Sequence, residues 1–355
     1  MIRVLIVDDS PTLRQLIRMV LESDPDLQVV GEARNGQDAV VLCHKLQPSI
    51  ITMDIRMPKM NGFQAIRQIM AESPRPIVVL TSKESDSELQ ISFKGVEAGA
   101  LSVIGKPTGL PGDDPEADQL LQQVKAMADV KVVRRRRSKT KQISPGGDNG
   151  PAAKPMGKPA EAGAYKIIAI GASTGGPPAL QTILSELPND LSVPVVIVQH
   201  ISPGFVEGLA RWLDETTPLQ CKLAEDREFL KPATVYLPPD GYHLLLSSAG
   251  RVRLDASPPV DGHCPSVTAM LESVVKHYGS AAIGVLMTGM GRDGARGLQE
   301  LHQAGGHTIA QDEATSVVFG MPKVAISLGA ADEVLPLHDI AKRLKKLVLV
   351  KRVAR

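Results

Sequence analysis

A serine lies on a glycine-rich turn between an apolar segment and a predicted helix. Ser173 belongs to Gly171–Gly176 (GASTGG), which follows the apolar residues 165–170 and precedes Pro177-Pro178. The glycines let the backbone turn tightly beside the hydroxyl, and the amides at a helix start can point at a developing anion. This pattern is typical of hydrolases in which a serine hydroxyl attacks a carbonyl carbon.

Two other segments could supply the base and the acid that this serine needs. His200 directly follows the predicted strand 193–199, and Asp293 lies in the glycine-rich loop 289–294 after another predicted strand. An imidazole can accept the hydroxyl proton, and a buried carboxylate can orient the imidazole. Because parallel strands end at one edge of a sheet, we expect these three side chains to lie together. Their order along the chain differs from the Ser, Asp, His order of α/β-hydrolases.

Each of the three residues also has an ordinary interpretation. Ser173 could cap the helix after its turn, Asp293 could cap the helix after its loop, and His200 could simply end a strand. A glycine-rich turn also suggests dinucleotide binding, but serine replaces the second glycine of G-x-G-x-x-G. The eight histidines show no H-E-x-x-H motif or close Cys/His grouping, so we expect no metal or other cofactor at this serine.

A second polar group follows the predicted strands of the first half. Asp8 and Asp9 come after the first strand, Asp54 after the third, Thr81 after the fourth and Lys106 after the fifth. Three converging carboxylates favour Mg²⁺, and the threonine and lysine suit a phosphoryl group. A carboxylate beside Mg²⁺ can attack a phosphodonor. The alternative for Asp8, Asp9 or Thr81 alone is a helix cap.

Short apolar runs alternate with amphipathic stretches through both halves of the chain. This rhythm predicts α/β architecture throughout, with a doubly wound, five-stranded parallel sheet in the first half. The predicted strands of the first half are Val4–Val7, Leu27–Gly31, Ile50–Met53, Ile77–Leu80 and Ala100–Ile104. The second half is predicted to form a mainly parallel sheet, with an antiparallel extension made by Thr234–Leu237 and Tyr242–Leu246 around a turn at Pro239-Asp240-Gly241.

Between the halves the periodicity disappears and the composition becomes basic and rich in Pro and Gly. We therefore predict domains at residues 1–125 and 164–350, joined by a flexible basic linker at residues 126–163. Arg134–Arg137 in this linker lacks interleaved aromatic residues, which favours a solvated hinge over a nucleic-acid site.

Composition limits the classes of function. The chain has 355 residues, with 40 basic against 39 acidic ones, so no net charge attracts nucleic acid or anionic lipid. Three cysteines without a Cys-x-x-Cys pair fit a reducing compartment. No signal peptide or membrane-spanning run is visible, so we expect a cytoplasmic protein without membrane insertion.

The first 125 residues resemble the receiver domain of two-component response regulators. The resemblance implies that Asp54 takes the phosphoryl group from a histidine kinase, that Asp9, Asp54 and the Arg56 carbonyl hold Mg²⁺, and that Thr81 and Lys106 contact the phosphate. Val103 occupies a position where receivers commonly carry an aromatic residue. The motifs that carry the resemblance are Val7-Asp8-Asp9-Ser10, Met53–Gly62 and Lys106-Pro107.

Residues 164–350 resemble the chemotaxis protein-glutamate methylesterase family. The resemblance implies hydrolysis of glutamate methyl esters on chemoreceptor cytoplasmic helices, with deamidation of receptor glutamines, by Ser173, His200 and Asp293. It places Thr174, His263 and Met290 around the site, with the Met290 backbone as an oxyanion donor. The motifs are Gly171–Gly176, Val198-Gln199-His200, Gly262–Val267 and Met287–Gly294.

A response regulator with a DNA- or protein-binding output and no esterase activity is the alternative. Arg134–Arg137 is its only support. A helix-turn-helix output would be expected in that case, whereas the second half alternates strands with helices and places glycine turns at strand ends.

Overall fold

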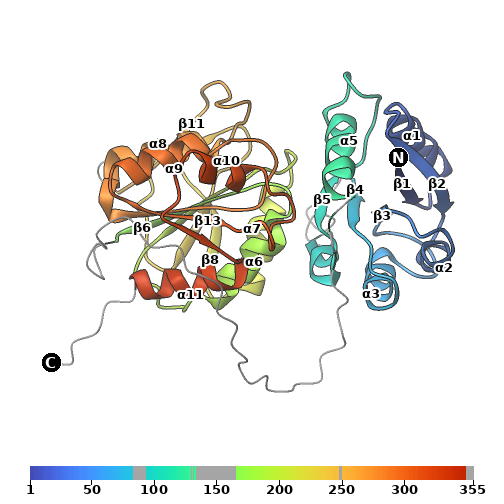
Figure 1. Ribbon diagram of the computed structural model, residues 1–355, viewed down its shortest axis with the longest axis horizontal. Coiled ribbons are helices and arrows are strands. Elements are labelled where there is room, and N and C mark those ends of the chain that lie inside the picture. The colour runs from blue at the N-terminus through green and yellow to red at the C-terminus, as the bar shows by residue number, and fades with distance from the viewer. Residues whose placement is uncertain (83–92, 129, 131, 133–164, 248–249, 349–355) are drawn as a thin grey trace, which may run out of the picture.

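The computed structural model describes residues 1–82, 93–128, 130, 132, 165–247 and 250–348 (Figure 1). Two α/β units follow one another along the chain, as the sequence predicted. Arg134–Arg137 and most of the predicted linker lie outside the described residues. Among the described residues, no helix combines the length and apolar character needed to cross a membrane.

The first unit is a five-stranded parallel sheet in the order β2-β1-β3-β4-β5. Alternate residues of β1 face opposite sides: Val4 and Ile6 pack with α1 and α5, and Leu5 and Val7 pack with α2 and α3. Helices therefore cover both faces, which confirms the doubly wound fold. The elements are β1 (Ile2–Val7), α1 (Pro11–Glu22), β2 (Leu27–Ala33), α2 (Gly36–Leu46), β3 (Ile50–Asp54), α3 (Gly62–Glu72), β4 (Ile77–Thr81), β5 (Ser102–Gly105) and α5 (Pro115–Met127).

The second unit contains a seven-stranded parallel sheet in the order β14-β13-β12-β6-β7-β9-β8, with a separate antiparallel pair, β10-β11. Its strands are β6 (Ile167–Ala172), β7 (Val195–Gln199), β8 (Gln220–Leu223), β9 (Thr234–Leu237), β10 (His243–Leu246), β11 (Val252–Asp255), β12 (Ala282–Leu286), β13 (His307–Gln311) and β14 (Glu333–Leu335).

Helices cover both faces of this larger sheet. Helices α8, α9 and α10 pack on one face, and α6, α7 and α11 pack on the other (Figure 1). The helices are α6 (Gly176–Glu186), α7 (Val206–Thr216), α8 (Val267–Tyr278), α9 (Ala295–Gln303), α10 (Met321–Ser327) and α11 (Leu337–Val348).

The predicted pairing of Thr234–Leu237 with Tyr242–Leu246 is wrong. The first of these segments is β9, which lies between β7 and β8 and is parallel to both. All four of its residues are buried, because the sheet continues on either side of it. The second segment, β10, instead pairs antiparallel with β11. The antiparallel extension exists, but it has a different partner.

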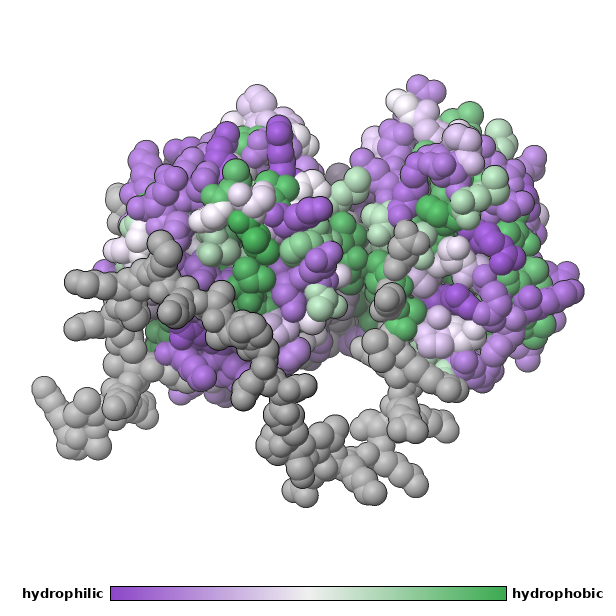
Figure 2. Space-filling model, viewed as in Figure 1, coloured by the Kyte–Doolittle hydropathy of each residue, from purple (hydrophilic) through white to green (hydrophobic). Residues whose placement is uncertain are grey.

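The two units contact each other through the helical residues 93–98 and helix α5 of the first unit. The rings of Phe93 and Trp212 stack at 5.6 Å between centroids, and the Trp212 indole donates a hydrogen bond of 2.9 Å to Glu97 Oε1. The Ser202 hydroxyl donates to Gln119 Oε1 of α5 at 2.5 Å. Figure 2 shows hydrophobic side chains gathered along this junction on the face in view.

Candidate active site

Ser173 occupies the short turn between β6 and α6. Gly175 is the N-cap residue of α6 and has a positive φ of 77°, and a Cβ on it would lie 2.5 Å from Val317. Glycine is therefore required beside the serine. The Ser173 amide donates to the Thr288 carbonyl at 3.0 Å. Within the described structure its hydroxyl makes no hydrogen bond, so the helix-cap interpretation of Ser173 receives no support.

Gln199 ties the serine turn to the histidine. Its side-chain amide nitrogen donates to the carbonyl of Ser173 at 2.8 Å and to the carbonyl of His200 at 2.7 Å. The Gln199 side chain is buried at the carboxyl end of β7. One amide group thus fixes the distance between two neighbouring strand ends. Sequence reasoning missed this residue, whose only signal was its place before His200.

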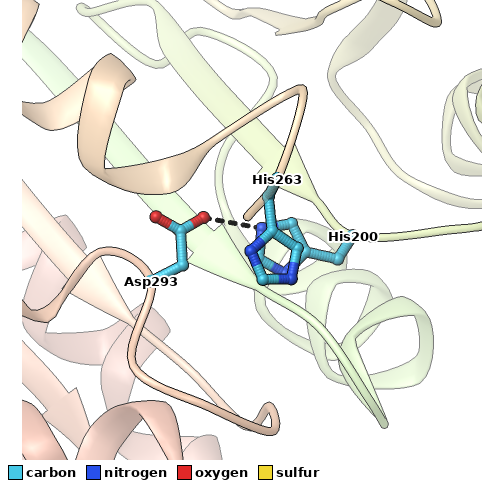
Figure 3. A group of neighbouring side chains, drawn as sticks. All are labelled: His200, His263 and Asp293. Atoms are coloured by element: carbon cyan, nitrogen blue, oxygen red, sulfur yellow. Dashed lines mark hydrogen bonds and ion pairs between the residues drawn. The ribbon is translucent and has the colours of Figure 1, made fainter. Parts of the chain in front are cut away.

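His200 and Asp293 form a direct pair (Figure 3). The imidazole Nε2 lies 2.7 Å from Asp293 Oδ2, and the His200 side chain is largely buried. In the described structure, His200 Nδ1 is buried and has no hydrogen-bond partner. When Nε2 carries the proton that Asp293 accepts, Nδ1 holds the free lone pair. Nδ1 is then the nitrogen available to act as a base.

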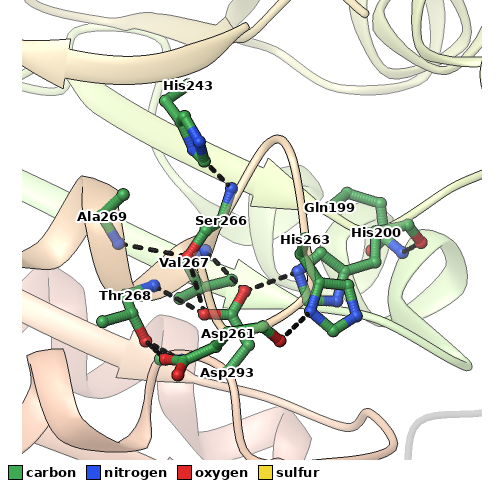
Figure 4. A network of polar contacts seen from close by, with 11 residues as sticks. Gln199, His200, His243, Asp261, His263, Ser266, Val267, Thr268, Ala269 and Asp293 are labelled. Atoms are coloured by element: carbon green, nitrogen blue, oxygen red, sulfur yellow. Dashed lines mark hydrogen bonds and ion pairs between the residues drawn. The ribbon is translucent and has the colours of Figure 1, made fainter. Parts of the chain in front are cut away.

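The Asp293 carboxylate is held by the start of helix α8 (Figure 4). Oδ1 accepts from the Ser266 hydroxyl at 2.8 Å and the Thr268 amide at 2.9 Å, and Oδ2 accepts from the Val267 amide at 2.8 Å. Gly294, without a side-chain cap, is the N-cap of α9, so Asp293 does not cap the helix that follows it. Asp293 instead binds the start of α8, which lies earlier in the chain.

These contacts set the charge of Asp293. Burial alone would raise its pKa, but the hydrogen bond from His200 and the amides of α8 outweigh burial and hold the pKa well below its usual range. The carboxylate is therefore ionised at neutral pH. With the bond to His200, its two oxygens accept four hydrogen bonds, which leaves them poorly suited to bind a metal ion even though His200, His263 and Asp293 lie within 4.8 Å of one another.

His263 stacks directly on the His200 imidazole. The two rings are 3.9 Å apart between centroids and inclined by 4°. The Asp261 carbonyl accepts a hydrogen bond of 2.9 Å from His263 Nδ1, which fixes the ring plane. Burial lowers the pKa of His263, and the neighbouring His200 lowers it further. A neutral ring therefore lies against His200.

The other two expected site residues, Thr174 and Met290, differ in exposure. Thr174 is buried, and its carbonyl accepts from the Thr288 hydroxyl at 2.8 Å. Met290, in the loop before Asp293, is 47% exposed. Within the described residues, the backbone amides of Thr174 and Met290 donate no hydrogen bond. Both amides are available to an oxyanion.

The acidic residues of the first unit converge as the sequence predicted. Asp8, Asp9 and Asp54 each place a carboxylate oxygen within 4.8 Å of the others. Lys106 Nζ lies 3.0 Å from Asp8 Oδ2 and 3.1 Å from Asp54 Oδ1. Thr81 is buried at the end of β4. Oxygen donors in this number, with one cation beside them, fit a hard divalent cation such as Mg²⁺.

Burial and neighbouring charges shift the pKa values of Asp54 and Lys106 in this cluster. Burial raises the pKa of Asp54 to about 6, with Lys106 opposing the shift and Asp8 adding to it. Burial alone would lower the pKa of Lys106, but Asp54 and Asp8 outweigh it and raise that pKa. Ser10, whose hydroxyl accepts from the Leu13 amide, caps α1, so the cap interpretation of Asp8 and Asp9 receives no support.

Both halves of the chain match family models. Residues 168–344 match the CheB methylesterase model, and residues 4–111 match the response regulator receiver domain model. A protein-glutamate methylesterase/protein-glutamine glutaminase of Myxococcus xanthus is 47% identical over 345 residues, covering 97% of this chain and 96% of the relative. One from Syntrophus aciditrophicus is 42% identical over 98% of both chains.

A solved structure matches the second unit. The crystal structure of the CheB methylesterase catalytic domain of Thermotoga maritima is 44% identical, with a TM-score of 0.50, and covers 52% of this chain and 99% of that chain. The likeness extends over almost the whole of that domain.

Proposed function

Because the chain belongs to the CheB methylesterase family and begins with a response regulator receiver domain, we propose that it hydrolyses glutamate methyl esters on chemoreceptors and releases methanol. Deamidation of receptor glutamines at the same site is part of the proposal, as is action in the cytoplasm. The observation that carries the proposal is the turn of Ser173, tied by Gln199 to a buried His200–Asp293 pair.

The proposed reaction proceeds through an acyl-enzyme. His200 Nδ1 takes the hydroxyl proton of Ser173 as the oxygen attacks the ester carbonyl. The amides of Met290 and Thr174 stabilise the oxyanion, and methanol leaves with the proton from His200. Water then cleaves the acyl-enzyme by the same route and leaves glutamate. A glutamine amide reacts in the same way, with ammonia as the leaving group.

Asp293 and His263 support this chemistry without bonding to substrate. The ionised Asp293 orients the imidazole and stabilises the positive charge that forms on it. His263 restrains the plane of that ring, and its lowered pKa keeps a second positive charge away from the forming imidazolium. Both roles require the α8 start and the His263 loop to hold their positions.

Phosphorylation of Asp54 by a histidine kinase is the proposed control. Asp8, Asp9 and Asp54 have the donor chemistry to hold Mg²⁺, which when bound would neutralise phosphate oxygens. In this proposal Thr81 and Lys106 contact the phosphoryl group. The metal and the phosphodonor are expected from the receiver domain match at residues 4–111.

The contact between the two units suggests how control reaches the esterase. A crevice of about 820 Å³ lies between them, and its lining includes Val96 and Ala126 of the receiver with Gly175, Thr288 and Val317 of the catalytic unit. The receiver therefore lies beside the turn of Ser173. We propose that it obstructs substrate access until phosphorylation. A tenfold excess of the closed state requires only about 1.4 kcal/mol to overturn.

The test is methanol release from membranes containing methylated receptor, with and without a small phosphodonor. The wild-type chain should release methanol faster with the phosphodonor, and Asp54→Asn should release it at the same low rate in both conditions. Absence of methanol release in every condition would overturn the esterase proposal. Equal stimulation of Asp54→Asn would overturn the assignment of the phosphorylated residue.

A further inference from the structure

Helix α5 lies on the side of the receiver nearest the catalytic unit (Figure 1). Its apolar residues Ala117, Leu120, Val124 and Met127 are buried in the receiver core. On another face, Gln119, Gln122, Gln123 and Ala126 follow the i, i+3, i+4, i+7 spacing of neighbours on a helix. We call these four residues the glutamine face.

The glutamine face contacts the loops that carry the proposed catalytic residues. Gln119 Oε1 accepts the hydrogen bond from Ser202, which lies two residues after His200. Gln122 and Ala126 line a crevice of about 660 Å³ together with Met290, which lies three residues before Asp293. Helix α5 thus lies next to the segment that follows His200 and the segment that precedes Asp293.

Apolar packing holds the helix in this place. Val317, whose Cβ lies against the turn of Ser173 at Gly175, also packs against the receiver core cluster that contains Leu120 and Val124. The Thr108 and Gly109 amides bind the carboxylate of Asp114, the N-cap of α5, at 2.6 and 2.8 Å. The helix is therefore fixed at its start and along its length.

From this arrangement we propose that α5 is a mimic of the substrate helix, occupying the surface on which a receptor helix docks. The inference rests on the proposed function, in which the enzyme accepts glutamine and methylated glutamate side chains on receptor helices. A helix with glutamines at positions 119, 122 and 123 presents the same side-chain amides. Ser202, which donates to the amide carbonyl of Gln119, could equally donate to an ester or amide carbonyl on the substrate.

Mimicry has a kinetic signature that simple obstruction lacks. Helix α5 and the receptor helix would compete for one surface, so the receiver raises the KM for receptor and leaves kcat unchanged. The crevices beside Met290 and Gly175 leave space around the helix. A small soluble ester needs no helix-docking surface, so its hydrolysis should not depend on the glutamine face.

The test uses the full chain without phosphodonor and the double variant Gln119→Ala/Gln122→Ala. Alanine is the strongest helix former, so α5 should be retained. Losing the hydrogen bond between Ser202 and Gln119, worth about 1 kcal/mol, should lower the KM for methylated receptor about fivefold at constant kcat. Hydrolysis of a small acetyl ester should be unchanged. Gln15→Ala, at an exposed position on α1, is the matched control and should alter neither activity.

Two results would overturn mimicry. One is a double variant with the wild-type KM for receptor, and the other is equal acceleration of the small ester and the receptor, which indicates general obstruction. Failure of the proposed function is distinguishable from both, because the phosphorylated wild-type chain would then release no methanol from receptor.

Discussion

The Asp293 carboxylate connects the imidazole to a helix start more than twenty residues earlier in the chain. One hydrogen bond comes from His200, and three come from Ser266, Val267 and Thr268. This carboxylate is thus fixed in position as well as in charge. Asp293 therefore sets the orientation of the His200 imidazole, because it holds Nε2 and leaves Nδ1 without a hydrogen-bond partner in the described structure.

Substitutions of Asp293 and of Ser266 should lower kcat by different amounts. Asp293→Asn favours the wrong imidazole tautomer, so kcat should fall by about 10⁴-fold. Ser266→Ala removes one of four hydrogen bonds to the carboxylate, and a bond to a charged group contributes about 1.5–3 kcal/mol, so kcat should fall about tenfold or more. Methanol release at saturating receptor measures both. A wild-type kcat for Asp293→Asn would contradict the assigned role.

Sequence reasoning identified the candidate residues that lie directly after strands. It missed those whose roles depend on partners far away in the sequence. Ser173, His200 and Asp293 follow recognisable strands or glycine turns. Gln199 and Ser266 have roles defined by partners 26 and 27 residues away, which no local pattern encodes. A serine before an apolar run is a typical helix N-cap pattern, and the structure shows that Ser266 caps α8, so this local role could have been predicted from the sequence.

Among the elements, the strands and helices were predictable and one pairing was not. The apolar runs of β1, β3, β6 and β7 show strands buried on both faces. The order in which strands join a sheet depends on the packing of the intervening helices. For that reason the predicted hairpin after β9 is wrong, and β9 is parallel to both of its neighbours.

Because the start of α8 stabilises the ionised form of Asp293, the free energy of unfolding should depend on pH. Its folded pKa lies below the ordinary value of about 4, so the ionised carboxylate stabilises the fold above that value. This contribution should decline as the pH falls below about 4. The free energy of unfolding of wild type should therefore exceed that of Asp293→Asn by about 1–3 kcal/mol at pH 7, and by less at pH 3.

Urea denaturation at the two pH values measures this difference. Glu22→Gln, on the exposed side of α1, is the control for the effect of low pH on the whole protein. Its free energy of unfolding should change between the two pH values as that of the wild type does. If the free energy of unfolding differs between wild type and Asp293→Asn by the same amount at pH 7 and pH 3, the charge of Asp293 does not contribute to stability.

The whole molecule joins a response regulator receiver domain to a hydrolase through a defined contact. The bond between Glu97 and Trp212 and the stack of Phe93 on Trp212 fasten the receiver beside the site. No local sequence pattern indicates this contact, because Trp212 reads only as an apolar residue of an amphipathic helix until the two units are placed together. The predicted domain limits and the role of the linker stay predictions.

Weakening this contact should release the esterase. Glu97→Ala leaves the Trp212 indole without its acceptor, a loss of about 1–2 kcal/mol that should raise basal methanol release up to about tenfold. The phosphorylated rate should change little, because the units have then already separated. Glu72→Ala, whose partners His44 and Gln68 belong to the receiver, is the control. An unchanged basal rate in Glu97→Ala would contradict inhibition through this contact.

The most direct test of the account is methanol release by phosphorylated Ser173→Ala. Removal of the nucleophile should lower the rate by about 10⁴-fold or more, because the three residues act as one unit. The thermal unfolding midpoint should match the wild type, since the hydroxyl makes no hydrogen bond in the described structure. We expect a folded variant that releases methanol from methylated receptor at the background rate, whereas release at a rate near that of the wild type would contradict the role of Ser173 as nucleophile.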